Sequence, residues 1–236
     1  MVLELRNSRD SEETPAAMEQ VFAALGSLGG HGGFFSKLFG PRHAPRFLSF
    51  ELLSVNSGIH FFIVIPASMQ TYVESQLTAQ YPKLVLTPAA DYAPHFLALP
   101  HASGQLVLAN SFYFPLKTHK DVRDLDMLAA VLGQMAKLPQ GEAVAVQLRI
   151  EPSGSSWQHA AQSIVARGIP DPQPNAPGRT KAHPHARLIE TKVNQVGFKT
   201  AIRVLAVAPS EDGAKRLLQS MAGSYGVFTL GEGNGL

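Results

Sequence analysis

The run FLSFELLSVNSGIHFFIVIP at residues 47–66 decides the fold. It holds two segments rich in aromatic and β-branched residues, 47–55 and 59–66, with Asn-Ser-Gly between them at 56–58. Asn and Gly tolerate backbone conformations with positive φ, which tight turns between antiparallel strands require. The run therefore predicts a β-hairpin, and the first half of the chain can be assigned around it.

A strand and a helix are predicted before the hairpin. Residues 2–6 alternate apolar and polar side chains, which is typical of a half-buried strand. Thr14 can cap a helix that has Pro15 at its first position, where a missing N–H costs nothing. An apolar stripe continues to Gly26, which we expect to end the helix in a left-handed conformation. The glycine-rich residues 29–33 predict a flexible loop.

A helix and a strand are predicted after the hairpin. Ser68 can cap a helix that runs to Tyr81, where Pro82 stops it. Residues 84–87 then predict a short strand. The resulting order is β-α-β-β-α-β, the split βαβ plan called ferredoxin-like.

The same pattern is predicted to recur in the second half of the chain. Its expected strands are residues 106–114, 143–151 and 198–208, and its expected helices are 124–137 and 210–225. That order lacks the last strand of the plan, and we interpret the end at Leu236 as a truncation. The predicted fold class is α+β, with two ferredoxin-like modules at residues 1–92 and 106–236 joined by a linker at 93–105.

A long insertion interrupts the second module at residues 154–195. Helices predicted at 156–167 and 185–195 flank the stretch 168–184, whose five prolines predict no regular element. We expect residues 168–184 to be mobile or disordered. Trp157 is expected to be a packing anchor rather than a platform for a stacked base.

Composition excludes several classes of chemistry. The 236 residues include no cysteine, which excludes a disulfide framework, thiolate zinc sites and thiol catalysis. Twenty Lys and Arg against eighteen Asp and Glu give a formal charge of +2, too small for a strong nucleic-acid footprint. The N-terminus lacks the apolar region of a signal peptide, and every apolar run is shorter than the ~20 residues that span a bilayer. We therefore expect a soluble chain.

Three motif-like segments favour structural interpretations over catalytic ones. Residues 29–37 hold glycines and a lysine but lack the residue order of a phosphate-binding P-loop. The sequence around Ser224, at 222–226, resembles a nucleophile elbow, but it follows a predicted helix and predicts a helix C-terminus instead. His183 and His185 form a pair that is typical of a solvated surface rather than a metal site. The sequence predicts no catalytic residue, no metal ligand and no cofactor.

A basic segment in the insertion is the candidate contact site. Its members are Arg167, Arg179, Lys181, His183, His185 and Arg187. Only Asp171 opposes their charge, so the segment could contact a phosphate backbone or an acidic protein partner. A solvated linker is the simpler interpretation of the same residues.

Several short segments of the sequence resemble those of one family of proteins. They are ETPAAMEQVFAAL at 13–25, SFE at 49–51 with FFI at 61–63, YVESQL at 72–77 with AQYP at 79–82, PLKT at 115–118, GE at 141–142 with QL at 147–148, Trp157, and VAP at 207–209 running to LL at 217–218. They resemble the N-terminal region of uncharacterised bacterial proteins, frequent in reduced-genome candidate phyla. Those proteins continue into a type IV secretion or conjugative coupling ATPase of the HerA/FtsK superfamily. The family's Walker A and Walker B motifs lie beyond this region, so the resemblance implies no catalytic residue here.

The resemblance implies a non-catalytic accessory or scaffold domain of a DNA-transfer or type IV secretion ATPase. Its expected partners are the ATPase motor domain or neighbouring subunits, DNA, or a second copy of the chain. The expected location is the cytoplasm, at the inner face of the membrane, with attachment only through segments outside this chain.

The alternative function is a stand-alone protein that binds single-stranded nucleic acid through a sheet face and the basic insertion. The candidate stacking residues are Phe61, Phe62, Phe112, Tyr113 and Phe114. Strand alternation is expected to bury about half of them. A hydrolase that uses Ser224 is the weakest of the three hypotheses.

Overall fold

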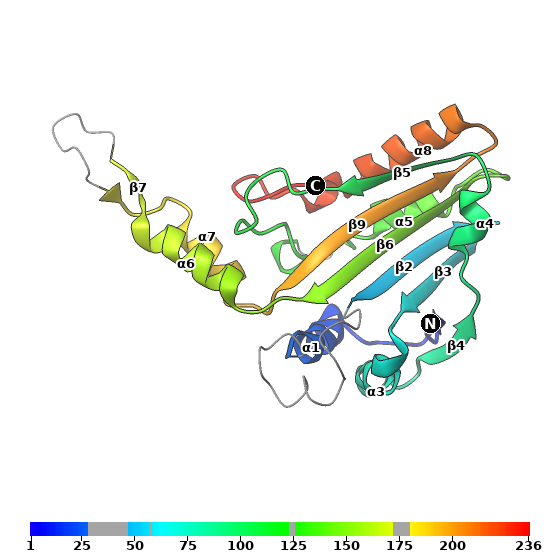
Figure 1. Cartoon of the computed structure of the whole chain (residues 1–236), viewed down its shortest axis with the longest axis horizontal. Helices are drawn as coiled ribbons and strands as arrows, with labels where there is room; N and C mark the ends of the chain where they lie inside the picture. The colour runs from blue at the N-terminus through cyan, green and yellow to red at the C-terminus, as the bar shows by residue number, and fades with distance from the viewer. Residues whose placement is uncertain (28–46, 57, 123–125, 172–179) are drawn as a thin grey trace.

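One antiparallel sheet of seven strands organises the molecule (Figure 1). The computed structural model describes residues 1–27, 47–56, 58–122, 126–171 and 180–236. The strand order is β4-β1-β3-β2-β6-β9-β5. The strands are β1 (Val2–Arg6), β2 (Leu48–Val55), β3 (Gly58–Val64), β4 (Val85–Ala89), β5 (His101–Leu106), β6 (Ala143–Pro152) and β9 (Phe198–Val207). The α+β class expected from the sequence is confirmed.

The first half follows the predicted β-α-β-β-α-β order. Helix α1 (Pro15–Gly26) connects β1 to β2, and helix α3 (Gln70–Gln80) connects β3 to β4 after a 3₁₀ turn at Ala67–Met69. The predicted hairpin is β2 and β3, and Asn56 at its turn has a φ of 50°. The spatial order β4-β1-β3-β2 places the first strand between the third and the fourth.

The second half adds three strands to the same sheet. Helix α5 (Ala129–Met135) precedes β6, and helix α8 (Glu211–Ser224) follows β9. Strand β6 pairs with β2 over seven residues, so the two halves share one continuous sheet. Strand β5 ends the sheet, because the described part of the chain places no strand on its outer side.

The connection between the halves differs from the prediction. The predicted linker at 93–105 holds helix α4 (Ala93–Leu97) and most of β5. The strand expected at 106–114 was placed too late, because Ser103 and Gly104 weakened the apolar pattern of the real strand. The aromatic residues that suggested a strand there pack instead against other helices.

Two of the predicted helix ends are also wrong. Gly26 is not left-handed, and Ser27 follows it with a φ of −63°. Ser68 makes no capping hydrogen bond, and α3 begins two residues later. The cap of α8 is confirmed, because the Ser210 hydroxyl accepts a hydrogen bond of 3.2 Å from the Gly213 amide.

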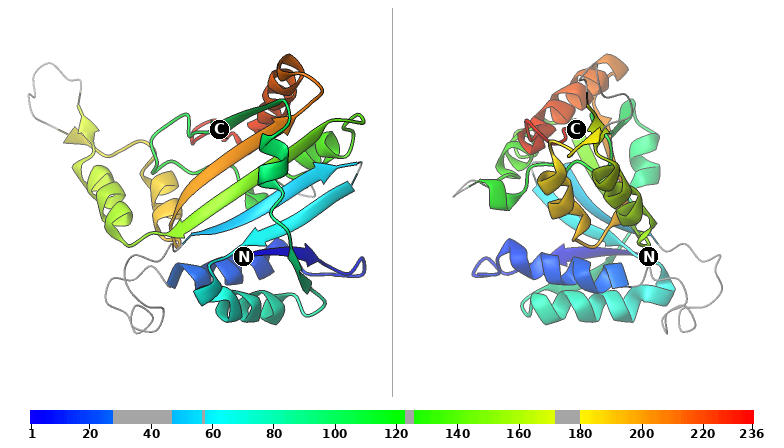
Figure 2. Two further views of the ribbon diagram at one scale, coloured as in Figure 1. Left: turned by 45° about the vertical axis from the view of Figure 1, so that its right-hand side comes forward. Right: turned by 90° about the vertical axis from the view of Figure 1, so that its left-hand side faces the viewer.

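Helices α1, α3, α5 and α8 lie on one face of the sheet. Beneath α1 and α3, a buried cluster includes Leu3 and Ile63. Beneath α5 and α8, a second cluster includes Val146 and Val204. Figure 2 shows α1 and α3 side by side against the sheet. The residues of both clusters point to the same side of their strands. On the other side, a third buried cluster, which includes Leu53, Ala145 and Val207, packs against Phe96 of α4.

An arm projects from the ends of β6 and β9 (Figures 1 and 2). It consists of α6 (Ser156–Arg167), α7 (Ala186–Val193) and a short ribbon of β7 (Ile169–Pro170) with β8 (Thr180–Lys181). The ribbon corrects the expectation that 168–184 holds no regular element. Residues 172–179, and the loop expected at 29–37, lie outside the described residues.

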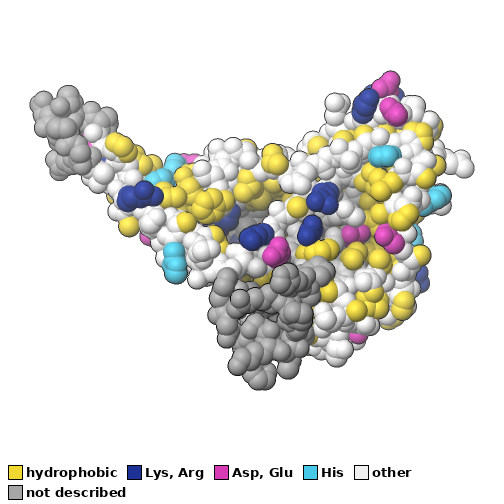
Figure 3. All heavy atoms as spheres, viewed as in Figure 1, with side chains coloured by type: hydrophobic (Ala, Val, Ile, Leu, Met, Phe, Trp, Pro, Cys, Tyr) yellow, Lys and Arg dark blue, Asp and Glu magenta, His cyan; other side chains and the backbone are white. Residues whose placement is uncertain are grey.

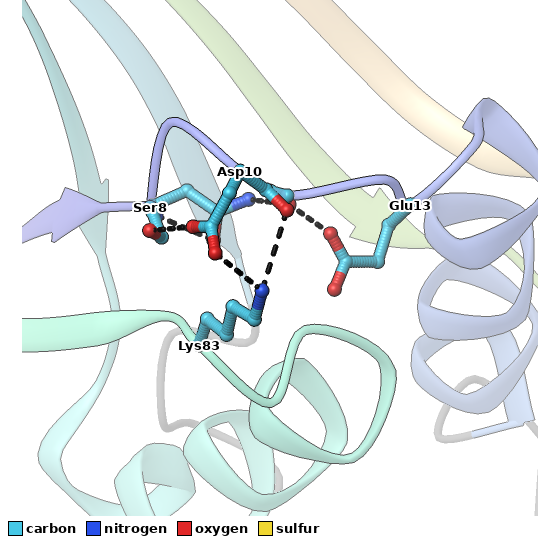
Figure 4. Close-up of polar contacts among 6 residues, drawn as sticks. Ser8, Asp10, Glu13 and Lys83 are labelled. Carbon is cyan, nitrogen blue, oxygen red and sulfur yellow. Dashed lines mark hydrogen bonds and ion pairs between the residues drawn. The ribbon is translucent and has the colours of Figure 1, made fainter.

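Polar contacts tie two connections together at one end of the first half (Figure 4). The Lys83 ammonium, which follows α3, lies 2.8 Å from Oδ2 of Asp10 and 3.3 Å from the Asp10 carbonyl oxygen. The Ser8 hydroxyl also donates to Asp10. The hydrogen bond from Lys83 is the main cause that lowers the pKa of Asp10.

Candidate functional site

The face of the sheet away from α1, α3, α5 and α8 is the candidate site, and we call it the open face. Residues paired across an antiparallel sheet point to the same side, so the register identifies its members. One row crosses all seven strands: Thr87, Glu4, Phe62, Glu51, Gln147, Arg203 and Gln105. Six of these seven side chains are polar. The neighbouring row beneath the helices is Leu86, Leu5, Phe61, Leu52, Val146, Val204 and Gly104.

A buried carboxylate lies at the centre of the open face. Glu51 is only 6% exposed, although it sits on the side of β2 that carries no long helix. The Ser49 hydroxyl donates to its Oε1 at 2.7 Å, and the Tyr92 hydroxyl donates to its Oε2 at 2.5 Å. Gln147 donates to the Tyr92 oxygen at 3.2 Å. These four residues form a connected polar network, which satisfies the groups that burial would otherwise leave without partners.

Helix α4 covers one end of this network. Tyr92 precedes the helix, and its ring centroid lies 5.9 Å from that of Phe62 and 5.5 Å from that of Phe96. Burial, and then the hydrogen bond to Glu51, raise the pKa of the Tyr92 phenol far above its ordinary value. The phenol therefore stays protonated and donates to the carboxylate throughout the physiological range.

A second acidic group lies toward the β1 end of the open face. Glu4 accepts from His60 at 2.9 Å and from Arg6 at 2.8 Å. The hydrogen bond from His60 is the main cause that lowers the pKa of Glu4, and Arg6 adds to it. This carboxylate is therefore ionised at neutral pH.

Basic side chains lie on the other half of the open face, on β6 and β9. The guanidinium of Arg149 stacks over the Phe47 ring, 3.9 Å from its centroid. Arg203 and Lys199 are exposed on β9, where Arg203 lies between the half-buried Ile202 and the buried Val204. Figure 3 shows Lys and Arg side chains near the middle of this face with acidic side chains beside them, and the face is hollowed where the arm leaves the sheet.

Trp157 and Lys192 hold the arm to the rest of the molecule. The indole of Trp157 lies so close to Gly197 that any side chain there would collide with it. This confirms the packing role expected for Trp157, although its buried Nε1 has no hydrogen-bond partner in the described residues. Lys192 donates to the carbonyls of Phe112 and Phe114 at 2.5 and 3.0 Å, and burial lowers its pKa.

The sequence-predicted contact residues lie on the arm, away from the open-face network. Arg167 ends α6 and donates to the Ser163 carbonyl at 3.2 Å. His183 and His185 have ring centroids 6.0 Å apart and both lie against Phe114. Lys181 on β8 and Arg187 on α7 are exposed, whereas Arg179 lies outside the described residues. The structure thus brings the two histidines together but joins them to no carboxylate cluster.

The aromatic residues expected to stack bases do not share one surface. Phe61 is 42% exposed but lies on the helix-covered face, and Phe62 is 8% exposed beneath Tyr92. Phe112, Tyr113 and Phe114 follow β5 without belonging to a strand. Tyr113 and Phe114 pack against the arm helices.

No cluster with the composition of a metal site or a nucleophile elbow occurs in the ranges that the structure describes. They contain no group of three or more His, Asp or Glu side chains that could hold a metal ion. Ser224 lies at the end of α8, where its hydroxyl donates to the Met221 carbonyl at 2.7 Å. In the same ranges, no helix is both long and apolar enough to cross a bilayer.

Sequence reasoning missed the open-face residues because it looked for motifs rather than register. Gln147 and Arg149 alternate with buried or half-buried apolar residues along β6, and this alternation was the available signal. Glu51 is the only charged residue in β2. Which side of the sheet lacks helices could not be read from a single strand.

Together these features define an α+β protein with four helices on one face of its sheet, a polar row and the short helix α4 on the other face, and a projecting helical arm. Residues 2–233 match the model of a family described as a domain of unknown function, DUF8128, and the chain belongs to that family. The chain matches no curated protein and no solved structure.

Proposed function

We propose that the chain is a non-catalytic scaffold domain that holds a partner protein on its open face. The observation that carries this proposal is the polar row that crosses all seven strands beside a fully apolar row one residue away. The exposed polar side chains of this row are chemically suited to a polar, reversible protein interface. Because segments of the sequence resemble the N-terminal region of DNA-transfer and type IV secretion ATPases, we propose the motor domain of such an ATPase as the partner.

The dimensions of the sheet limit how large an interface the open face can form with a partner protein. Seven strands spaced about 4.8 Å apart extend about 29 Å across, and strands of five to ten residues extend about 17–33 Å along their axes. The outline of the whole sheet is on the order of 700 Å², and because α4 covers part of it, the exposed part is smaller than the ~800 Å² that each partner contributes to a standard interface and corresponds to a weaker, transient contact. Helix α4 and the arm stand at the margins of this area and would orient the partner (Figure 1).

The charge of the open face favours a protein over a nucleic acid. Its basic residues are Arg6, Arg149, Lys199 and Arg203, and its acidic residues are Glu4, Glu51 and Glu151. A nearly balanced pattern offers complementary pairs to a protein surface, whereas a phosphate backbone requires a dominant positive field. We place this scaffold in the cytoplasm at the inner face of the membrane, where a secretion or conjugation motor works.

The test is binding to a purified coupling ATPase domain from the same genome, measured by isothermal titration. Arg203→Glu with Lys199→Glu reverses two exposed charges on the open face, and we expect at least tenfold weaker binding. The matched control is Lys137→Glu with Arg216→Glu, which reverses two exposed charges on the helix-covered side and should leave binding unchanged. Equal affinity of the two double variants, or no binding by the unaltered chain at 100 µM (about −5.5 kcal/mol), would overturn the proposal.

A second titration tests the non-catalytic part of the proposal. The chain alone is titrated with ATP and Mg²⁺, and no heat of binding is expected. Micromolar affinity for ATP would show a nucleotide site that the proposal does not contain, and would contradict it.

A second candidate function is the binding of single-stranded nucleic acid. The specific observation in its favour is the Arg149 guanidinium stacked on Phe47, next to the exposed Arg203 and Lys199 on β9. Fluorescence anisotropy with a single-stranded oligonucleotide across a salt titration separates the two functions. Nucleic-acid binding predicts a steep salt dependence that Arg203→Glu with Lys199→Glu reduces. Absence of binding at low salt excludes this candidate.

A further inference from the structure

Strand β5 presents an unpaired edge. Its residues pair with β9 on the inner side, from His101 opposite Val207 to Leu106 opposite Ile202. On the outer side, no backbone segment in the described ranges bonds to residues 102–106. The C-terminal residues lie past the end of β5, where the Ala109 amide donates to the Gly235 carbonyl at 3.0 Å.

The first half of the molecule shows what such an edge can hold. Strand β1 occupies the position in the first half that β5 occupies in the second, because each starts its β-α-β-β-α series and lies outside the third strand of that series. The outer side of β1 pairs with β4 over five residues, from Val2 opposite Ala89 to Arg6 opposite Val85. The corresponding side of β5 has the same hydrogen-bonding groups and no strand from the described chain.

The two edge strands of the sheet differ in their protection against further pairing. Edge strands in soluble proteins are usually guarded by proline, by charged residues or by bulges. Strand β4 contains Pro88, which lacks an N–H donor. Strand β5 reads HASGQL, with neither a proline nor a formal charge, and the exposed Val107 and Leu108 follow it.

Helix α8 carries an apolar side chain to the middle of the β5 edge. Leu218 lies against Gly104, where an added Cβ would be 3.5 Å from its side chain. Leu218 and Ala222 are both half-buried and lie one turn apart on α8. Because α8 contacts both β9 and β5, it lies over the line between these strands.

We propose that a second copy of the chain pairs with β5 in antiparallel fashion, around a two-fold axis that is normal to the sheet near residues 103–104. The two seven-stranded sheets then form one continuous sheet of fourteen strands, with helices α1, α3, α5 and α8 of both copies on the same face. Two α8 helices, each about one strand spacing from the axis, lie about 10 Å apart, which is the packing distance of helices. Leu218 of each copy faces the other across the axis.

The choice of a second copy follows from the composition of the edges. An uncharged strand can pair with itself around a two-fold axis without placing like charges opposite each other. Pairing of β5 with β4 of another copy would instead form an open chain of molecules, and Pro88 opposes it. This inference is independent of the proposed scaffold function, because it depends on the backbone hydrogen-bonding groups of β5 and is tested by the mass of the chain alone, without the proposed partner.

The test measures the mass of the full chain in solution by light scattering after size-exclusion chromatography. The unaltered chain is expected to elute as a dimer when it is loaded at about 100 µM. Ser103→Lys with Gln105→Lys places charges on the exposed side chains of the β5 edge and should give a monomer. Val85→Lys with Thr87→Lys makes the same change on the β4 edge, and this control should remain a dimer.

Three outcomes would overturn the proposal: a monomeric unaltered chain, a dimer that the β5 variant retains, or a dimer that both edge variants lose. Because the chain has no cysteine, Ser103→Cys gives an independent measurement that needs no destabilising charge. A short bismaleimide should link two Ser103→Cys chains into a covalent dimer and should not link two Val85→Cys chains. Equal cross-linking at both edges would also contradict pairing through β5.

Discussion

The helix-covered face and the open face are built by the same seven strands, one residue apart. Val146 and Val204 point toward α5 and α8 and are almost fully buried, whereas their neighbours Gln147 and Arg203 point the other way. A strand alternates its side chains strictly, so both faces have the same backbone rigidity. The difference teaches that the face under the four helices carries two of the buried apolar clusters, whereas the other face combines a smaller apolar cluster beneath α4 with a row of polar side chains.

The largest expected effect comes from a truncation beneath the helices. Ile63 is fully buried under α1 and α3, so Ile63→Ala should lower the free energy of unfolding by about 2–5 kcal/mol. Arg203→Ala, on the open face, should change it by less than about 0.5 kcal/mol. Urea unfolding followed by circular dichroism measures both. Comparable losses for the two variants would contradict the division of roles between the faces.

Glu51 differs from the exposed polar residues of the open face because it is buried there. Glu51→Ala removes the acceptor for the Ser49 and Tyr92 hydroxyls and should cost about 1–3 kcal/mol in the same unfolding assay. Glu51→Gln keeps the shape and one acceptor oxygen, so its cost should be smaller. A neutral Glu51→Ala variant would mean that the network contributes nothing to folding.

One buried tyrosine near each face of the sheet allows the two faces to be compared at alkaline pH. Burial raises the pKa of Tyr225, beneath α8, to about 12, and burial with the hydrogen bond to Glu51 raises that of Tyr92 on the open face. A folded-state pKa above the unfolded value of 10 means that the associated stability is complete below pH 10 and is lost as pH rises further.

We expect Tyr92→Phe to reduce the alkaline loss of unfolding free energy by at most about 1.4 kcal/mol per pH unit above pH 10. Tyr225→Phe should reduce it in the same way from the other face. Urea unfolding between pH 9 and 12 gives the slopes, and tyrosinate absorbance identifies which group titrates. An unchanged slope in both variants would show that neither phenol is protected.

The smallest expected effect is the acid response of Glu4. Its folded-state pKa is lowered, so its contribution is present above its unfolded pKa and is lost as pH falls through the folded value. Because Arg6 and His60 are substantially exposed, the contribution should stay below about 1 kcal/mol. Glu4→Gln should flatten the acid limb of the unfolding free energy below pH 4.5. A steeper acid limb in this variant would contradict the assignment.

The elements with strong local signals were predictable from the sequence. The hairpin of β2 and β3, helix α6 and the cap of α8 each depend on neighbouring residues, and each was confirmed. Strand β5 was misplaced because its register depends on β9, almost a hundred residues later. Local pattern cannot show such a partner.

The open face could not be predicted for a similar reason. Glu51 meets Tyr92 only because the segment that leads into α4 folds back over β2, and Arg149 stacks on Phe47, which immediately precedes β2. The basic segment of the insertion was visible as a run of residues, and its role remains a prediction. The functions proposed for both surfaces stay predictions as well.

The contact of Trp157 with Gly197 has a spectroscopic consequence. Trp157 is the only tryptophan in the chain, and it sits where α6 leaves the sheet. Its fluorescence therefore reports on the root of the arm alone, without a label. Any ligand that swings the arm away from the sheet would expose the indole to water and shift its emission to longer wavelength.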